Sequence, residues 1–449
     1  MRIAVVGGGL AGLATAYRLM HASADVVVCE AGTPGGSLRS VDVGGFSLPA
    51  GADGFWGRKP WAVDLCRELG VEVVAPASSG TYLWTDSGLV AYPSDAAFGI
   101  PGDPGDVLRW PGLSRAGRRR ALGDLLRSKR KSEGDQTLGS LLRRRLGDEA
   151  TDRAVAPLLT APSLGDVDAM SLRATYPDLE RWEDWQGSLI RGSQAARRSL
   201  RRGPAAAPML VRPRGGVEAL PRAIVSELTG RVRAGCRGVG LERGAGWRLV
   251  LDRGDPVEAD VVVLATPAAQ ARCLLDPIAG DVAASLGDLT TTSAVTVLLV
   301  YAEGTQPSLP AGTGFVVPRG KAPMRSCAWL SSRWPDPSYG SRAIVSCALG
   351  GVGDEDVVRA PDHDIVTACA RHLAAVLPLP DAPEHASVVR WPDAVPRYEV
   401  GHLEHVARVR EQLPPGIFVV GQAYDGADVA DVVRAAGEVA DAVIQELEP

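Results

Sequence analysis

The sequence predicts an α/β fold in which a discontinuous Rossmann-like domain is combined with a mixed-sheet domain and a helical insertion. Three observations favour this fold. The chain opens on a short apolar strand, a glycine-rich turn and a helix; a second buried strand spans residues 259–264; and a glycine-led segment from residue 421 introduces the last helix. Strands that alternate with helices build parallel sheets, so we expect both ends of the chain in one domain.

The first element is a dinucleotide-binding turn. Residues 2–7 form a short apolar run typical of a buried parallel strand, and the helix after it is opened by Gly7-Gly8-Gly9-Leu10-Ala11-Gly12. Gly7 permits the tight turn, Gly9 lets the backbone approach a pyrophosphate, and Gly12 lets the helix pack closely on the strand. The free N–H groups of the helix N-terminus favour the phosphate charge.

The second strand, residues 25–30, ends in a carboxylate. Glu30 follows Gly12 by 18 residues and is itself followed by Ala31. An acid at this position accepts hydrogen bonds from an adenosine ribose and disfavours a 2′-phosphate. NADP is therefore not expected.

The next segment indicates FAD rather than NAD. Gly35 and Gly36 lie just past the acid and are followed by Ser37 and Arg39. At this position FAD oxidases of the amine-oxidase type have a glycine pair that lets a loop cross the diphosphate. A glycine pair alone usually marks a turn, so it is the position that favours a flavin.

Composition excludes several classes of protein. At 449 residues with 45% hydrophobic residues the chain is long enough for two or three domains, and its net charge of −5 argues against a general nucleic-acid binder. The sequence contains no run of 18 apolar residues, which is the length that a membrane-spanning helix needs. Membrane association is therefore expected to be peripheral at most. The seven cysteines show no CxxC spacing, which indicates neither a metal site nor a disulfide framework, and the cytoplasm is the expected compartment.

The middle of the chain is rich in arginine and helical in pattern. Basic clusters occur at residues 118–120, 129–131, 143–145 and 191–202. They have two interpretations: solvated faces of surface helices, or a positive rim for an anionic substrate or an anionic lipid surface.

Strand and helix signals return after this region. Residues 214–220 start a helix, residues 231–233 form a strand that returns to the nucleotide-binding domain, and the buried strand at 259–264 ends in Ala265-Thr266-Pro267. We expect this turn to lie near the cofactor.

Several short motifs occur in an order that is hard to obtain by chance. They are Gly51-Ala52-Asp53-Gly54-Phe55, Thr137-Leu138, Met170-Ser171-Leu172, Gly187-Ser188-Leu189-Ile190 and, most specific, Trp391-Pro392-Asp393-Ala394-Val395-Pro396-Arg397-Tyr398-Glu399-Val400-Gly401-His402. Together they resemble the protoporphyrinogen/coproporphyrinogen oxidase family of FAD enzymes, within the flavin amine oxidase superfamily, over nearly the whole chain.

The resemblance implies three structural units. A discontinuous FAD-binding domain comprises residues 1–60, 206–280 and 385–449; a mixed-sheet substrate-binding domain comprises residues 61–95, 176–205 and 281–384; and residues 96–175 form the helical arginine-rich insertion. The substrate cavity is expected between them, over the flavin.

The resemblance also implies noncovalent FAD, because no cysteine follows Cys369 to form a covalent attachment. Val232 would meet the adenine through its backbone, and residues 427–429 would face the pyrimidine edge. The residues expected to bind FAD are Gly7, Gly8, Gly9, Leu10, Ala11, Gly12, Glu30, Ala31, Gly35, Gly36, Ser37, Arg39, Gly51, Ala52, Asp53, Gly54, Val232, Trp391, Gly421, Ala427, Asp428 and Val429. No catalytic acid or base and no metal ligand is named.

The activity implied is the oxygen-dependent oxidation of a porphyrinogen to a porphyrin in heme biosynthesis. Coproporphyrinogen III is the first expectation and protoporphyrinogen IX the alternative. Each two-electron step would pass a meso-carbon hydride to flavin N5, with hydrogen peroxide formed from molecular oxygen; a pyrrole nitrogen stabilises the cation, so little acid/base help is needed. The substrate carboxylates need arginine partners, and a downstream heme-pathway enzyme is a candidate partner.

Two other functions stay open. A flavin oxidase or desaturase of an amine or specialised metabolite would keep the same cofactor residues, and Lys321 is its candidate active-site lysine. A divergent paralogue would bind FAD or a tetrapyrrole without efficient turnover.

Three departures from the family pattern accompany the resemblance. Residues 160–164 lack most of a Gly-hydrophobic-Tyr-small-Gly-Asp element, Ser37 stands where many relatives have Lys or Arg, and Asp428 replaces a small residue at the start of the last helix. Asp428 has two interpretations: a simple N-cap, or a carboxylate that opposes the helix dipole and lowers the flavin potential.

Overall fold

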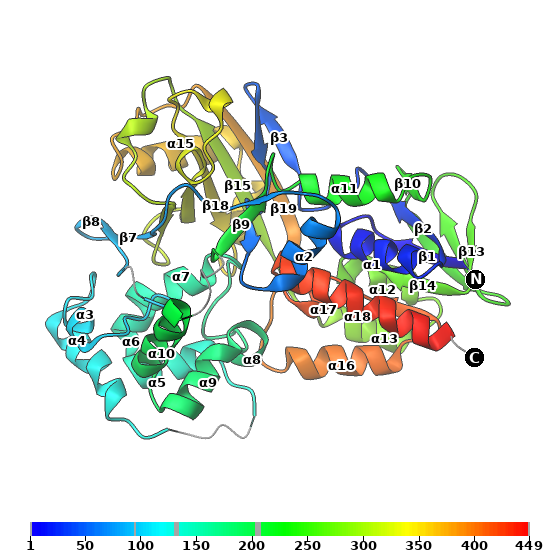
Figure 1. Cartoon of the computed structure of the whole chain (residues 1–449), viewed down its shortest axis with the longest axis horizontal. Helices are drawn as coiled ribbons and strands as arrows, with labels where there is room; N and C mark the ends of the chain where they lie inside the picture. Colours follow the sequence, from blue (N-terminus) through cyan, green and yellow to red (C-terminus); the bar gives the residue numbers. More distant parts are fainter. Residues whose placement is uncertain (1, 94–95, 130–133, 203–207, 448–449) are drawn as a thin grey trace.

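A parallel sheet joins strands from distant parts of the chain. The computed structural model describes residues 2–93, 96–129, 134–202 and 208–447. The strand order is β10–β2–β1–β14–β20, with every neighbouring pair parallel. The bounds are β1 Arg2–Val6, β2 Asp25–Glu30, β10 Val232–Ala234, β14 Val261–Leu264 and β20 Ile417–Val419. This sheet confirms the predicted discontinuous Rossmann-like fold (Figure 1).

The order of these strands creates a switch point. From β1 the chain builds outward to β2 and β10 on one side, and to β14 and β20 on the other. Ligands of open α/β sheets bind outside the carboxyl ends of the strands at such a point. The turn after β1, at residues 7–9, lies at this point.

Both faces of the parallel sheet are covered, which explains why its strands are continuous apolar runs rather than alternating ones. One face packs against α1 Leu10–His21, α2 Pro60–Glu68, α11 Ala219–Glu227 and α18 Val429–Leu447. The other packs against the meander β11 Gly238–Arg243, β12 Trp247–Leu251 and β13 Val257–Ala259, and against α12 Ala268–Leu275, α13 Gly280–Gly287 and α16 His402–Gln412.

A mixed sheet forms the core of a second domain-like unit. Its order is β19–β15–β18–β17–β16–β7–β8, antiparallel except for the β16–β7 pair. The strands are β7 Tyr82–Thr85, β8 Gly88–Ala91, β15 Thr291–Val300, β16 Gly314–Val316, β17 Met324–Trp329, β18 Ile344–Gly350 and β19 His385–Pro396, and α15 Asp362–Ala374 covers one face. The pairing of β19 with β15 is irregular between Thr292 and Ala294.

Two small sheets connect these layers. The hairpin of β3 Ser40–Val43 and β4 Phe46–Pro49 leads to β5 Phe55–Trp56, which pairs with β9 Leu210–Pro213; β9 also pairs with β6 Val73–Val74. The short helices α14 Leu330–Arg333 and α17 Gln422–Asp425 follow β17 and β20.

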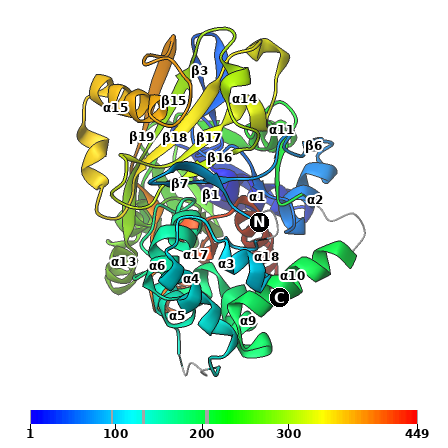
Figure 2. The same ribbon diagram turned by 90° about the vertical axis from the view of Figure 1, so that its left-hand side faces the viewer.

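A helical unit projects from the two sheet domains (Figures 1 and 2). Its helices are α3 Pro104–Leu108, α4 Arg115–Leu122, η1 Gly123–Leu125, α5 Leu138–Leu146, α6 Asp148–Ala150, η2 Thr151–Val155, α7 Ala156–Thr160, α8 Leu172–Thr175, α9 Pro177–Gln186 and α10 Leu189–Arg202. Leucines of α5, α9 and α10 share one core, including Leu142, Leu179 and Leu189. The predicted domain boundaries remain predictions.

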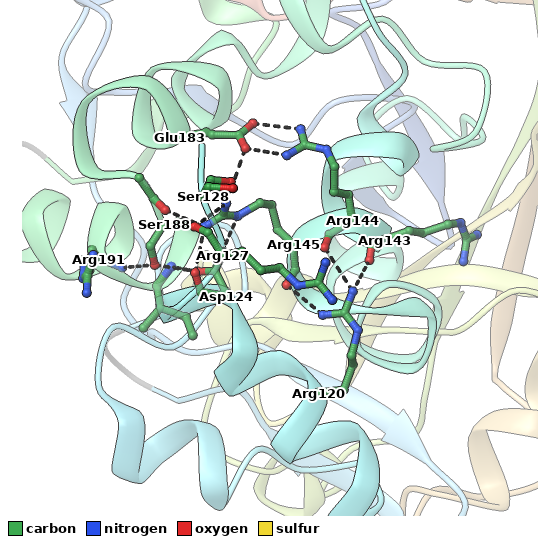
Figure 3. Close-up of polar contacts among 12 residues, drawn as sticks. Arg120, Asp124, Arg127, Ser128, Arg143, Arg144, Arg145, Glu183, Ser188 and Arg191 are labelled. Carbon is green, nitrogen blue, oxygen red and sulfur yellow. Dashed lines mark hydrogen bonds and ion pairs between the residues drawn. The ribbon is translucent and has the colours of Figure 1, made fainter. Parts of the chain in front are cut away.

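The centre of the helical unit holds a buried arginine. Arg145 is fully buried and its guanidinium donates to the Asp124 carboxylate (Nε–Oδ1, 2.5 Å) and to the carbonyl oxygens of Asp124 and Gly187 (2.7 and 2.5 Å). Asp124, also fully buried, accepts further hydrogen bonds from Ser188 Oγ and Ile190 N (2.6 and 3.0 Å). Figure 3 shows the contacts among Asp124 of η1, Arg145 of α5 and Ser188, which directly precedes α10.

The neighbouring arginines are also engaged. Arg144 pairs with Glu183 (Nη2–Oε2, 2.8 Å), and Arg120 donates to the carbonyl oxygens of Arg143 and Arg144 at the end of α5 (2.9 and 3.0 Å). Both interpretations of the basic clusters are therefore wrong for Arg145, because a guanidinium buried among protein partners neither faces solvent nor meets a ligand. Arg191 on α10 is exposed, as the first interpretation expects; Arg130 and Lys131 lie outside the described residues.

Candidate functional site

The turn after β1 has room only for glycine at two positions. Gly7 has φ +105°, and a Cβ there would lie 2.6 Å from the Ala265 carbonyl oxygen; a Cβ on Gly12 would lie 2.0 Å from the Gly7 carbonyl oxygen. The helix α1 can therefore pack this closely on β1 and β14 only because both side chains are absent. The expected geometry of the turn is present.

Gly9 differs from its neighbours in facing open space. A Cβ on Gly9 would meet no heavy atom of the described residues within 4 Å. Gly9 is the N-cap of α1, whose first turn is Leu10-Ala11-Gly12 and so contains no acid. The N–H groups of this turn and the positive end of the helix dipole can receive an anion, and a diphosphate fits this geometry.

A second glycine loop lies over this turn. Gly35 N donates to Gly8 O at 2.8 Å, and a Cβ on Gly36 would lie 3.1 Å from Gly9 Cα. The loop at residues 35–37 therefore lies beside Gly8 and Gly9 and leaves the Cβ side of Gly9 open. The resemblance expects a loop at this place that crosses the diphosphate.

Glu30 is fixed at the carboxyl end of β2. Its Oε2 accepts Gly8 N–H at 2.6 Å, and its Oε1 accepts Gly32 N–H at 2.8 Å. Each carboxylate oxygen keeps acceptor capacity for a ribose hydroxyl. Ala31 follows it and is exposed, while Val232 lies on the edge strand β10, opposite Val28.

A further wall comes from residues far apart in the sequence. A Cβ on Gly51 would lie 3.2 Å from Ser37 O and 3.5 Å from the Trp391 ring, and the Arg39 guanidinium lies 5.0 Å from the centre of that ring. Trp391 Nε1 donates to Thr296 Oγ1 at 3.2 Å. Four residues expected to bind the cofactor are thus neighbours in the structure: Ser37, Arg39, Gly51 and Trp391.

Hydrogen bonds to Asp53 fix the segment at residues 51–54. The Asp53 carboxylate accepts Arg333 Nη1 at 2.7 Å and Trp334 Nε1 at 3.1 Å, and a Cβ on Gly54 would lie 2.8 Å from Val211 O. The Asp53 side chain therefore anchors this segment, including Ala52, to α14. Sequence reasoning did not single out Arg333, because nothing local marks it as a partner of Asp53.

The C-terminal glycine-led segment lies against the first helix. Gly421 has φ +131°, and its Cβ position is 3.6 Å from Ala11 Cβ. Gln422 Nε2 donates to the carbonyl oxygen of Ala427 at 3.2 Å, which fixes the turn before α18. Asp428 Oδ1 accepts Ala430 N at 2.9 Å, so the predicted N-cap geometry is present, and Val429 begins the helix and is buried.

The departure at residues 160–164 borders a small hollow. This hollow is lined by residues of the helical unit and by the segment that follows β19: Ser163, Gly165, Asp166, Ala169, Met170, Thr175, Val352, Pro396, Arg397, Tyr398 and Glu399. Ser163 Oγ is buried there without a hydrogen-bond partner among the described residues. The hollow therefore lies where the expected units meet.

The two tryptophans of α9 lie in different environments. Trp182 packs against Phe98, with ring centres 5.5 Å apart, whereas the Trp185 side chain is 76% exposed. Trp182 therefore contributes to the packing of the helical unit, and Trp185 faces solvent.

One known protein family matches almost the whole chain. The family described as flavin containing amine oxidoreductase matches residues 10–444. The chain belongs to this family. It is a FAD-dependent oxidoreductase, and the open Gly9 face, the α1 N-terminus and Glu30 fit its cofactor.

The relatives of this flavoprotein extend over its whole length. It is 32% identical to coproporphyrinogen III oxidase of Mycobacterium leprae (99% of this chain and 98% of the relative) and 28% identical to that of Bacillus subtilis (96% and 95%). A crystal structure of a proposed protoporphyrinogen oxidase from Exiguobacterium sp. 255-15 superimposes with a TM-score of 0.87 at 30% identity, covering 100% of this chain and 99% of the other. The predicted resemblance is confirmed.

Among the described residues, no helix has the length and hydrophobicity that crossing a membrane requires.

Proposed function

We propose that this flavoprotein oxidises coproporphyrinogen III to coproporphyrin III, with protoporphyrinogen IX as a second substrate to be ranked against it. The observation that supports the proposal most is the end-to-end similarity, at 32% identity, to a coproporphyrinogen III oxidase, together with the convergence of the glycine segments at one edge of the parallel sheet.

The reaction removes six electrons and six protons from the macrocycle. Bound FAD supplies a two-electron acceptor, so three rounds are needed for each substrate molecule. We propose molecular oxygen as the final acceptor, three molecules of which would become hydrogen peroxide. Atoms and electrons then balance without a further reductant or oxidant.

The chain's own residues bind and position the cofactor in this proposal. The turn at residues 7–12 would hold the diphosphate, Glu30 the ribose and the backbone of Val232 the adenine, while Gly51 and Trp391 would line the other end. No residue is assigned as a general acid or base. Loss of the meso-carbon hydride would leave a cation that a pyrrole nitrogen stabilises, and the proton on that nitrogen would then be acidic enough to leave. Placement and charge are therefore the tasks left to the protein.

The amine-oxidase alternative depends on Lys321. Lys321 Nζ lies 2.5 Å from Asp86 Oδ1, so the lysine joins the turn between β16 and β17 to the turn between β7 and β8. This contact gives Lys321 a structural role and does not favour the alternative.

The cytoplasm is the compartment proposed for this protein, from the state of its cysteines. All seven cysteines, every one within the described residues, are free thiols and six are buried. Free thiols are typical of a reducing compartment, which supports the cytoplasm. Peripheral contact with a membrane at most, and contact with a downstream heme-pathway enzyme, remain proposals.

The test is a direct assay on the purified protein. Its visible spectrum is recorded for bound flavin, and porphyrin fluorescence is then followed after coproporphyrinogen III or protoporphyrinogen IX is added in air. Enzyme-dependent fluorescence above the spontaneous rate is expected with coproporphyrinogen III. Faster oxidation of protoporphyrinogen IX would reverse the ranking of the two substrates.

A matched variant separates cofactor chemistry from other effects. Glu30→Ala is expected to retain less FAD and to lose activity in proportion, with recovery in excess FAD; a fully flavinated Glu30→Ala protein would contradict the ribose assignment. A wild-type protein that holds FAD but oxidises neither substrate would overturn the proposal in favour of a different oxidase or a paralogue without turnover.

A further inference from the structure

Asp428 lies where two expected flavin segments meet. Its Oδ1 accepts Ala430 N–H at 2.9 Å in the first turn of α18, and its Oδ2 accepts the backbone N–H of Trp56 at 3.3 Å. Trp56 belongs to β5, directly after the segment at residues 51–54. One carboxylate therefore connects the N-terminus of α18 to a strand 372 residues away in the sequence.

The N-terminus of α18 lies at the ligand edge of the parallel sheet. β20 ends at Val419, and the chain then passes Gly421, which lies against Ala11 in the first turn of α1. α18 itself packs along α1 in the same core. The start of α18 is thus placed beside the first turn of α1. Both lie at the carboxyl ends of the parallel strands, where ligands of such sheets bind.

The charge of Asp428 acts on the positive end of this helix. The N-terminus of an α-helix corresponds to about half a positive charge and favours anions in front of it. Asp428 takes up one of its free N–H groups and sets a negative charge against that dipole. Alanine and valine flank Asp428, so the carboxylate is the charge closest to the helix start in the sequence.

The surroundings keep Asp428 from being a simple surface cap. Burial is the main cause that raises its pKa, and the Asp431 carboxylate on α18 raises it further. The two backbone hydrogen bonds and Lys59, just before α2, lower it. Lys59 forms an ion pair with Asp431, and Asp425 at the end of α17 pairs with Arg410, so the other charges around the helix start are largely matched.

We propose that Asp428 belongs to the flavin site and that its charge weakens binding of the reduced cofactor, so that the flavin is harder to reduce when the carboxyl is ionised than when it is protonated. This inference rests on the proposed function only for the presence of FAD at this site and requires no porphyrinogen. It adds a proton-linked control that the small residue of the family pattern at this position would lack.

The test measures the flavin reduction potential of the full-length protein by reductive titration against a reference dye at several pH values. Asp428→Asn keeps the size of the side chain and removes the charge, and Asp428→Gly restores a small residue. Both are expected to favour the reduced flavin about tenfold at alkaline pH, which is about 30 mV for a two-electron couple. The difference from the wild type is expected to shrink towards acidic pH, where Asp428 is protonated.

Glu438→Gln is the matched control, because it removes one negative charge from the exposed face of the same helix. It is expected to leave the potential unchanged at every pH. Equal potentials for wild type and Asp428→Asn over the whole pH range would overturn the proposal.

FAD affinity supplies a second measurement. Removing a negative charge beside an anionic cofactor is expected to leave FAD binding unchanged or to tighten it. Loss of FAD from both Asp428 variants would therefore overturn the electrostatic role and leave Asp428 with a purely structural one. Because the titration uses no porphyrinogen, failure of this inference is distinguishable from failure of the proposed activity.

Discussion

Gly51 and Trp391 lie against each other although 340 residues separate them: a Cβ on Gly51 would be 3.5 Å from the indole ring. The contact joins the loop after β4 to the long strand β19 of the mixed sheet. It is the point at which the nucleotide-binding segments and the mixed sheet share a wall of the candidate site.

This contact predicts the effect of enlarging Gly51. In Gly51→Val the Cβ would be only 3.2 Å from Ser37 O, and its methyl groups would press on the Trp391 ring. Separating these loops is expected to lower FAD affinity by about tenfold, or ~1.4 kcal/mol, measured by FAD titration of the apoprotein. Gly437→Ala, on the open side of α18, serves as the control, and an unchanged affinity in Gly51→Val would show that this wall is not part of the FAD site.

The glycines of the first turn are expected to separate folding from binding. Gly9→Ala adds a methyl group to open space at φ −70°, so it is expected to leave the thermal unfolding of the apoprotein unchanged while weakening FAD about tenfold or more. Gly12→Ala would place its Cβ 2.0 Å from the Gly7 carbonyl oxygen and is expected to destabilise the fold by about 3 kcal/mol. Denaturation of both apoproteins and FAD titration check this; a destabilised Gly9→Ala would contradict it.

The buried ion pair of the helical unit is expected to be sensitive to loss of one partner. Arg145→Met leaves Asp124 as a fully buried charge without its guanidinium, which costs about 3–5 kcal/mol. Urea denaturation followed by circular dichroism measures the loss. Arg191→Ala, at an exposed position of α10, is expected to change stability by less than about 0.5 kcal/mol. Equal stabilities of the two variants would mean that the Arg145 network contributes little.

His402 predicts a pH dependence of stability. Burial lowers its pKa from 6.5 to about 4, and its Nε2 has no hydrogen-bond partner among the described residues. The unfolded chain binds this proton at a higher pH than the native state does. The contribution of neutral His402 to the free energy of unfolding is therefore fully present above pH 6.5 and is lost as the pH falls towards 4. The loss amounts to about 3 kcal/mol.

Substitution isolates this contribution. His402→Asn is expected to flatten the fall in unfolding free energy between about pH 6.5 and 4, whereas His363→Gln, at an exposed position, is expected to keep it. Chemical denaturation at closely spaced pH values gives the two slopes. The same slope in wild type and His402→Asn would assign the acid sensitivity to other groups.

Local signals allowed much of the nucleotide-binding half to be predicted. The strand at residues 25–30, the helix after Gly9 and the start of the last helix at Val429 are found as expected. Each depends on a short stretch of backbone: an apolar run that suits a parallel strand, glycines that permit a turn, or a polar residue that caps a helix. Such elements are specified by neighbouring residues and can be read without knowing the rest of the fold.

Only the tertiary structure decided which distant groups become partners. The sequence by itself indicated a helix N-cap as one of two interpretations of Asp428, but not that its second oxygen reaches Trp56. It marked Asp53 as part of a flavin segment, but not that Arg333 and Trp334 donate to its carboxylate. It also could not distinguish the buried Arg145 from the exposed Arg191, because an arginine's environment depends on what packs over it. Hydrogen bonds and ion pairs act over a few ångströms in space, and no local pattern records which residues the fold will bring that close.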